Sequence, residues 1–191
     1  MRNIVGAISQ QKLIRALLSN MNIMGLEYEW IQGKSKVWIR KQLDDLGIEE
    51  NLKAITWEYQ GKQKVLAFNL SLPIIKKNVD LCLFSANNIE YDHGKIVLTP
   101  EKIVMLGELK GGIDPAGADE HWKTASTALQ RIRSGFASKG IKIKTSFIGA
   151  AIATNMANEI WEHLIAGDLD YAANLTVDEQ VIDYCNWIIT Q

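Results

Sequence analysis

The sequence predicts an α/β fold, a mixed β-sheet flanked by helices, and three observations support it. Residues 54–70 have the pattern of a β-hairpin, with a turn at Gly61-Lys62. A mostly apolar run over 102–110 precedes a helical pattern over 119–138, and a second apolar run over 141–152 follows. Because a helix that connects two neighbouring strands of a sheet normally leaves them parallel, the sequence predicts a parallel pair beside the antiparallel hairpin.

The other elements follow from hydrophobic spacing and capping residues. In the helix 119–138, Asp119 is the expected N-cap, and the apolar positions that set the spacing are Trp122, Ala125, Leu129, Ile132 and Phe136. Further helices are predicted over 7–24, 35–46, 48–53, 154–165 and 176–189. A strand is predicted over 79–84 and a loop over 85–94. We expect a single domain, with a helical N-terminal part (1–53) and an α/β core (54–191).

Length and composition are those of an ordinary globular protein. The chain has 191 residues, 47% of them hydrophobic and 23% charged, which is enough for a substantial core. No apolar run reaches the roughly 20 residues that span a membrane, and the N-terminus does not resemble a signal peptide. Cys82 and Cys185 each stand in an apolar context without zinc-site spacing, so buried free thiols are favoured over a disulfide. A cytoplasmic protein is expected.

Charge is unevenly distributed although the net charge is only −1. Residues 121–158 contain no acid but carry Lys123, Arg131, Arg133, Lys139, Lys142 and Lys144. The chain after Lys144 contains no lysine or arginine, only acidic charges. A globally basic nucleic-acid binder is therefore not indicated, but one positive face that binds a polyanion is. Two solvated faces of opposite sign are the alternative.

The stretch Glu108-Leu109-Lys110 carries the candidate chemistry. Residues two apart in a strand share a face, so Glu108 and Lys110 are expected side by side, with the carbonyl of Leu109 available at the sheet edge. Asp80, which begins an apolar strand, is the best-placed second carboxylate, and Asp92 is the alternative. Two carboxylates and a carbonyl form an oxygen ligand set that Mg²⁺ accepts. Mg²⁺ would polarise a scissile phosphate, while Lys110 positions or deprotonates the attacking water or neutralises developing charge.

A Glu-x-Lys pair alone is weak evidence, because chance supplies about one in a chain of this composition. The combination is more specific: the pair lies in a predicted strand, an isolated acid begins an earlier strand, and a helix and a basic strand follow. This arrangement resembles the core of the PD-(D/E)XK nuclease fold. The Pro-Asp pair that names the superfamily is absent, since Asp80 follows Asn78-Val79.

The segment 107–125, Gly-Glu-Leu-Lys-Gly-Gly-Ile-Asp-Pro-Ala-Gly-Ala-Asp-Glu-His-Trp-Lys-Thr-Ala, closely resembles the catalytic segment of the AvaI/BsoBI type of type II restriction endonucleases. The resemblance runs from about residue 54 to the C-terminus. It implies a Mg²⁺-dependent enzyme that cuts double-stranded DNA at a CYCGRG-like palindrome as a homodimer. Members of this family have a larger N-terminal helical portion, so we expect either a compact relative or a fragment.

The resemblance also assigns roles to residues. It implies an active site of Asp80, Glu108, Lys110 and His121, with Asp80, Glu108 and Leu109 holding the metal and His121 assisting the attacking water. Packing at the start of the helix is the alternative for His121. Lys77 and Asp114 match base-contacting positions, since a lysine can donate to guanine and a carboxylate can accept from cytosine. From the charge pattern, the expected phosphate contacts are Lys123, Arg131, Lys142 and Lys144.

The sequence is also compatible with two other functions. One is a repair or junction nuclease of the same fold, which would prefer branched DNA. The other is a DNA-binding module without catalysis, in which Glu108 and Lys110 merely pair.

Overall fold

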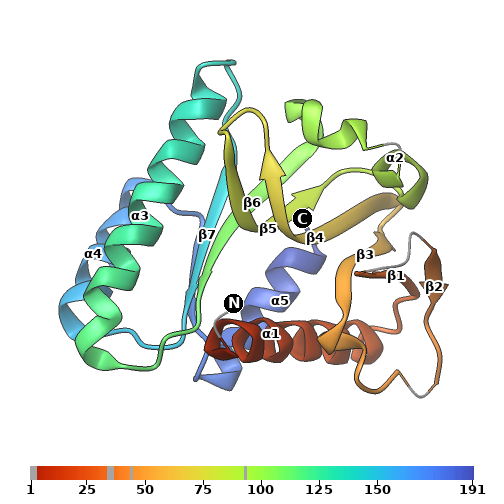
Figure 1. The fold of residues 1–191 in the computed structure, drawn as a ribbon, viewed down its shortest axis with the longest axis horizontal. Coiled ribbons are helices and arrows are strands. Elements are labelled where there is room, and N and C mark those ends of the chain that lie inside the picture. The colour runs from red at the N-terminus through yellow and green to blue at the C-terminus, as the bar shows by residue number, and fades with distance from the viewer. Residues whose placement is uncertain (1–3, 34–36, 44, 93) are drawn as a thin grey trace.

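Eight strands form one mixed sheet in a computed structural model of the chain, which describes residues 4–33, 37–43, 45–92 and 94–191 (Figure 1). In sheet order the strands are β2 (Trp38–Arg40), β1 (Tyr28–Gln32), β3 (Leu52–Tyr59), β4 (Lys62–Leu72), β5 (Lys77–Phe84), β6 (Ile103–Lys110), β7 (Lys144–Gly149) and β8 (Tyr171–Asn174). Neighbouring strands are antiparallel from β2 to β6, whereas β6, β7 and β8 are parallel. The predicted mixed sheet is confirmed.

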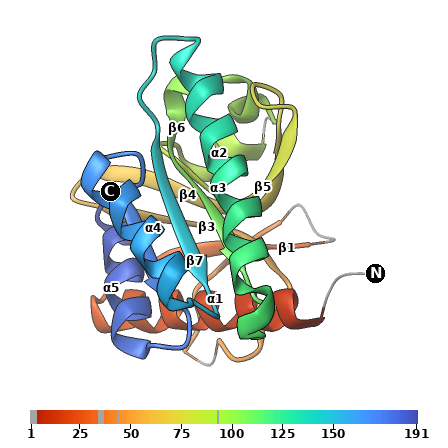
Figure 2. The same cartoon turned by 90° about the vertical axis from the view of Figure 1, so that its left-hand side faces the viewer.

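Helices cover both faces of the sheet, which makes three layers (Figures 1 and 2). Among the described residues, the α-helices are α1 (Ile4–Ile23), α2 (Asn88–Asp92), α3 (Pro115–Ala137), α4 (Thr154–Ala166) and α5 (Asp178–Ile189), and the short 3-10 helices are η1 (Ile48–Glu50), η2 (Lys95–Leu98) and η3 (Pro100–Lys102). On one face, α1 and α5 bury residues such as Leu17 and Ile188 against Leu81 of the sheet. On the other, α3 and α4 pack against strand residues such as Leu106 and Phe147.

The crossover from β6 to β7 through α3 matches the prediction. The five apolar residues that set the helical spacing are all buried, and the two strands are parallel, with Lys110 opposite Gly149. The predicted start at Asp119 is wrong, because α3 begins at Pro115. Proline suits the first turn of a helix, where its missing N–H has no intrahelical acceptor to lose. Asp119 instead lies inside α3, 2.5 Å from the Lys123 ammonium.

The N-terminal part is less helical than predicted. The helix expected over 7–24 corresponds to α1, but the helix expected over 35–46 is wrong, because the described residues there contain strand β2. Residues 35, 36 and 44 of that prediction lie outside the described residues. Strands β1 and β2 pair with each other and β1 pairs with β3, so this segment extends the sheet. Its aromatic and β-branched residues suit a pleated surface, and the cross-strand partners Glu29 and Arg40 form an ion pair.

Several shorter segments also differ from the prediction. The helix expected near 48–53 is reduced to η1, and the strand that starts the hairpin begins at Leu52. The loop expected over 85–94 contains the short helix α2. Strand β8 was not predicted, because four residues between two helices give too short a hydrophobic pattern.

Two further expectations can be compared with the structure. Cys82 and Cys185 are buried free thiols, as predicted. None of the described helices combines the length and the apolar character that crossing a membrane requires.

Candidate active site

Asp80, Glu108 and Lys110 lie together where β5 and β6 diverge. Nζ of Lys110 is 2.6 Å from Oε2 of Glu108 and 3.4 Å from Oδ2 of Asp80. Glu108 and Lys110 share a face of β6 because side chains two residues apart in a strand point the same way. Asp80 is adjacent because Leu81 of β5 is the cross-strand partner of Gly107. One ammonium group therefore contacts two carboxylates from neighbouring strands.

Asp80 also stabilises the backbone at the end of β6. The paired register of β5 and β6 reaches Leu81 and Gly107. Beyond that pair, the N–H of Leu109 donates to Oδ2 of Asp80 at 2.9 Å. The side chain thus takes the place of a strand partner for this backbone group, which fixes the carboxylate relative to Glu108 and Lys110.

Burial dominates the electrostatics of the cluster. Glu108 is only 5% exposed, and this burial, together with the Asp80 carboxylate, raises the pKa of Glu108 although Lys110 opposes the shift. Burial alone would lower the pKa of Lys110, but Glu108 and Asp80 outweigh it and raise that pKa. Lys110 therefore stays protonated at neutral pH, and Glu108 still lacks full compensation for its charge.

The donor chemistry of the cluster fits a hard divalent cation. The buried Glu108 carboxylate needs a counter-charge, and carboxylate and carbonyl oxygens are the ligands that such cations prefer. In the described ranges, no group of three or more His, Cys, Asp or Glu side chains is assembled that could hold a metal. A cation here would be held by Asp80 and Glu108, with the Leu109 carbonyl and water completing its shell.

His121 lies against the loop that leaves β6. A Cβ atom added to Gly112 would collide with Nε2 of His121, so the half-buried imidazole packs directly on the backbone of Gly112. Gly112 is two residues beyond Lys110 in the chain. The geometry is compatible with both roles considered for His121, assistance to the attacking water and packing at the helix start. The imidazole packs near the start of α3 and also lies beside the loop that follows β6.

The segment 107–125 that carries this cluster is part of a longer similarity. A family model described as "Restriction endonuclease BsobI" matches residues 1–191. The chain belongs to this family of restriction endonucleases. It is 52% identical to the type II restriction enzyme BsoBI of Geobacillus stearothermophilus over 192 residues, 99% of this chain and 59% of that protein.

A second relative matches the chain over nearly the same length. The type II restriction enzyme AvaI of a Nostoc species is 43% identical over 189 residues, which are 99% of this chain and 60% of the relative. The chain thus spans about three fifths of the length of the relatives it matches. The mostly antiparallel eight-stranded sheet with flanking helices is consistent with a restriction endonuclease fold.

The residues predicted to contact DNA lie at different distances from the Asp80–Glu108–Lys110 cluster of this BsoBI-family chain. Lys77 is exposed at the start of β5, three residues before Asp80, and Asp114 is exposed directly before α3. Lys123 lies on α3 and forms ion pairs with Asp119 and Glu120. Arg131 lies further along the same helix.

Lys142 and Lys144 are remote from the Asp80–Glu108–Lys110 cluster. Lys144 is opposite Met105 on β6, five residues before Lys110, which corresponds to about 17 Å along a strand. Lys142 precedes Lys144 in the same connection from α3. The structure therefore does not bring these two lysines to the Glu108–Lys110 end of β6, whereas Lys77 is three residues, about 10 Å along β5, from Asp80.

Helix α1 is a neighbour of the active site that the sequence did not indicate. A Cβ atom at Gly111 would collide with the Ser9 hydroxyl and lie 2.8 Å from the carbonyl oxygen of Val5, so the first turns of α1 rest on the residue that follows Lys110. A cavity of about 180 Å³ beside Asp80 is lined by Gly6, Ala7, Gln10, Gln11, Glu49, Glu50, Asn69, Asp80 and Leu109. No motif in the sequence links α1 to this site, because the contacts are tertiary.

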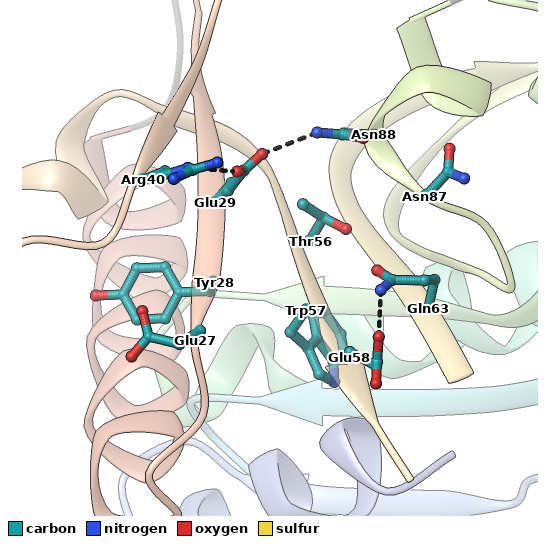
Figure 3. A pocket seen from close by; sticks show the side chains of 10 residues that line it. All are labelled: Glu27, Tyr28, Glu29, Arg40, Thr56, Trp57, Glu58, Gln63, Asn87 and Asn88. Atoms are coloured by element: carbon teal, nitrogen blue, oxygen red, sulfur yellow. Dashed lines mark hydrogen bonds and ion pairs between the residues drawn. The ribbon is translucent and has the colours of Figure 1, made fainter. Parts of the chain in front are cut away.

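A larger pocket, of about 500 Å³, lies at the hairpin end of β3 and β4 (Figure 3). Its acidic side chains are engaged: Glu29 binds Asn88 at 2.8 Å and Arg40 at 3.3 Å, and Glu58 accepts from Gln63 at 2.7 Å. Asp80 and Glu108 do not line it. It is therefore separate from the candidate active site.

The alternative metal ligand Asp92 is also placed elsewhere. Its two carboxylate oxygens each accept from Nε1 of Trp38 at 2.9 Å. Trp38 belongs to β2, the first strand in the sheet order, whereas Glu108 belongs to β6. Asp80 is thus the acid that the fold brings to Glu108.

Proposed function

We propose that this chain is the catalytic part of a type II restriction endonuclease, which hydrolyses phosphodiester bonds in double-stranded DNA with Mg²⁺. The observation that carries the proposal is the contact of one ammonium, that of Lys110, with the carboxylates of Asp80 and Glu108 from neighbouring strands. Membership of the restriction endonuclease family supports the substrate and the reaction class. A CYCGRG-like palindrome is the proposed target.

The residues of the cluster have distinct proposed roles. Asp80 and Glu108, with the Leu109 carbonyl, hold the metal, which when bound polarises the scissile phosphate and acidifies a water. Lys110 positions that water and neutralises negative charge that develops on the phosphate. His121 assists the water from the side of Gly112, and the raised pKa of Lys110 keeps its ammonium charged throughout.

Recognition of DNA is assigned to residues outside the cluster. Lys77 and Asp114 are proposed to contact base edges. Lys123, Arg131, Lys142 and Lys144 are proposed phosphate contacts, of which the last two would touch the duplex away from the scissile bond. The protein is proposed to act in the cytoplasm of a prokaryotic cell. Because a palindrome has two-fold symmetry, we propose that the whole enzyme acts as a homodimer.

Digestion of plasmid DNA tests the proposal. The unmodified chain, Glu108→Gln, Lys110→Met and the control Glu179→Gln, which neutralises an exposed acid of α5, are compared with and without Mg²⁺. Discrete fragments that require Mg²⁺ and disappear only in the first two variants support the proposal. If the unmodified chain and all three variants bind DNA but none of them cleaves it, the proposal is contradicted and a DNA-binding module without catalysis is favoured. Faster cleavage of branched than of linear DNA favours a junction nuclease.

A further inference from the structure

Helix α1 and strand β4 meet beside the catalytic acid Asp80. Nδ2 of Asn69 donates to Oε1 of Gln10 at 2.7 Å, joining residues 59 positions apart. Both side chains line the cavity of about 180 Å³ whose wall also includes Asp80 and Leu109. The hydrogen bond therefore closes part of the space next to the carboxylate that accepts from the Leu109 N–H.

Asn69 occupies an unusual position in its strand. The flanking pairs are Phe68 with Leu81 and Leu70 with Val79, so Asn69 of β4 lies opposite Asp80 in the register, but these two residues are not themselves paired. The backbone φ of Asn69 is +57°, in the left-handed region that residues other than glycine rarely adopt. Asparagine tolerates this conformation better than most residues. A strained residue thus lies directly opposite the candidate metal ligand.

We propose that Gln10 and Asn69 are positioning residues for the metal site, and that their hydrogen bond fixes the place of the Asp80 carboxylate. This inference rests on the proposed function and names two residues for it outside the metal ligands. Asn69 sets the local path of β4 and hence of β5 at Asp80, while Gln10 anchors Asn69 to α1. Without this anchor, the cavity gives the carboxylate room to turn away from Leu109 and Glu108.

The position of α1 explains how the anchor holds. Its first turns also rest on Gly111, next to Lys110, through Ser9 and Val5. The helix therefore contacts the segment after β6 and, through Gln10, the strand beside β5. Groups behind a metal ligand typically change metal affinity by 10- to 100-fold when they are removed. We expect Gln10 and Asn69 to act at the lower end of this range, since they reach the metal only through Asp80.

The test uses variants that separate the hydrogen bond from backbone strain. Asn69→Gly keeps the left-handed backbone and removes the amide, while Gln10→Met removes the acceptor at similar length. Gln60→Gly is the matched control, because Gln60 has a φ of +50° in the remote hairpin turn. Calorimetry with Mn²⁺ measures metal affinity directly. Single-turnover cleavage over a range of Mg²⁺ concentrations and thermal melting complete the set.

We expect Asn69→Gly and Gln10→Met each to weaken Mn²⁺ binding by about tenfold, with an equal rise in the Mg²⁺ concentration for half-maximal cleavage. The double variant should be no weaker than either single one, because both remove the same bond. Gln60→Gly should bind Mn²⁺ like the unmodified chain. Unchanged Mn²⁺ affinity in both single variants, or additive losses in the double variant, overturns the proposal, whatever the melting temperatures do.

A Glu108→Gln variant separates this inference from the proposed function. If Glu108→Gln binds Mn²⁺ as well as the unmodified chain, the metal site itself is wrong. If Glu108→Gln loses Mn²⁺ while Asn69→Gly and Gln10→Met keep it, the metal site holds and only the positioning role fails.

Discussion

Nζ of Lys110 lies 2.6 Å from Oε2 of Glu108, two residues earlier on the same strand. This contact follows from the Glu-x-Lys spacing, because both side chains leave β6 on one face. Burial and the Asp80 carboxylate nevertheless raise the pKa of Glu108. The Lys110 ammonium thus does not fully offset the free-energy cost of burying the Glu108 carboxylate beside a second carboxylate. Part of the negative charge of the cluster stays uncompensated.

The uncompensated negative charge predicts that substitutions of Glu108 and of Lys110 change the stability of the protein in opposite directions. Glu108→Gln removes the buried charge, so the melting temperature without metal should rise and the further rise on adding Mg²⁺ should disappear. Lys110→Met leaves two carboxylates without their ammonium, so the melting temperature without metal should fall and its rise with Mg²⁺ should exceed that of the unmodified chain. Thermal melting with and without Mg²⁺ checks both. Identical Mg²⁺ effects in all three proteins would contradict a metal site here.

His121 can be tested through the glycine it contacts. His121→Ala should slow single-turnover cleavage by about a hundredfold, the lower end for a positioned acid or base, and leave DNA binding unchanged. Gly112→Ala should have a similar effect, because the added Cβ would displace Nε2 of His121. Gly117→Ala is the control, since a Cβ there lies 3.7 Å from the same atom, an ordinary contact. Unchanged cleavage rates in His121→Ala would remove the imidazole from the active site.

The strands of the candidate site could be predicted because their signals are local. The helical spacing of Trp122 to Phe136 and the apolar runs beside it set the order strand, helix, strand, and face alternation placed Glu108 with Lys110. That Asp80 is the partner acid could be inferred from its place at the start of an apolar run, although β5 itself begins three residues earlier, at Lys77. The register and the hydrogen bond to Leu109 could not, because they depend on where the pairing of β5 and β6 ends.

The parts that were missed depend on longer-range structure. The segment around Trp38 has too few residues to distinguish a helix from a strand, and its pairing with β1 decides the outcome. Contact between Gln10 and Asn69 joins a helix and a strand 59 residues apart. A left-handed asparagine inside a strand has no signature in the hydrophobic pattern. Such features follow from tertiary packing, which overrides local propensity.

Lys64 predicts a pH-dependent change in stability. Lys64 is 4% exposed, and burial, with the charges of Lys62 and Lys144, lowers the pKa of its ammonium. A lysine with a lowered pKa in the folded state destabilises that state while charged, and the effect is relieved as the pH rises through the folded-state pKa towards 10.5. Lys64→Met should therefore stabilise the protein by about 1 kcal/mol near pH 7, and less as the pH approaches 10.

Denaturant unfolding from pH 7 to pH 10 checks this prediction. Lys95→Met, which removes an exposed lysine near η2, is the control and should change the free energy of unfolding little at any pH. A stability gain in Lys64→Met that is constant over this range would contradict the assigned pH dependence.

Ser146 and Tyr184 form a buried hydroxyl pair beside strand β6. Their oxygens lie 2.7 Å apart, both residues are fully buried, and a Cβ at Gly107 would lie 2.5 Å from Oγ of Ser146. Ser146→Ala leaves the Tyr184 hydroxyl without this partner, which should cost about 1–3 kcal/mol. Tyr184→Phe should lower the free energy of unfolding by less through the loss of this bond, because the Ser146 hydroxyl keeps a second partner. Its Oγ is also 3.3 Å from Sδ of Met105.

The double variant decides whether the pair acts as a unit. Replacing both hydroxyls leaves no buried partner unsatisfied, so the loss of unfolding free energy should be smaller than the combined losses of the single variants, by about 1 kcal/mol. Because neither residue is assigned to the catalytic cluster, Mn²⁺ affinity of the folded protein should stay near that of the unmodified chain. Additive losses would mean that the two hydroxyls are stabilised independently. A large fall in Mn²⁺ affinity would instead show that strand β7 sets the position of Glu108 through its contact with Gly107.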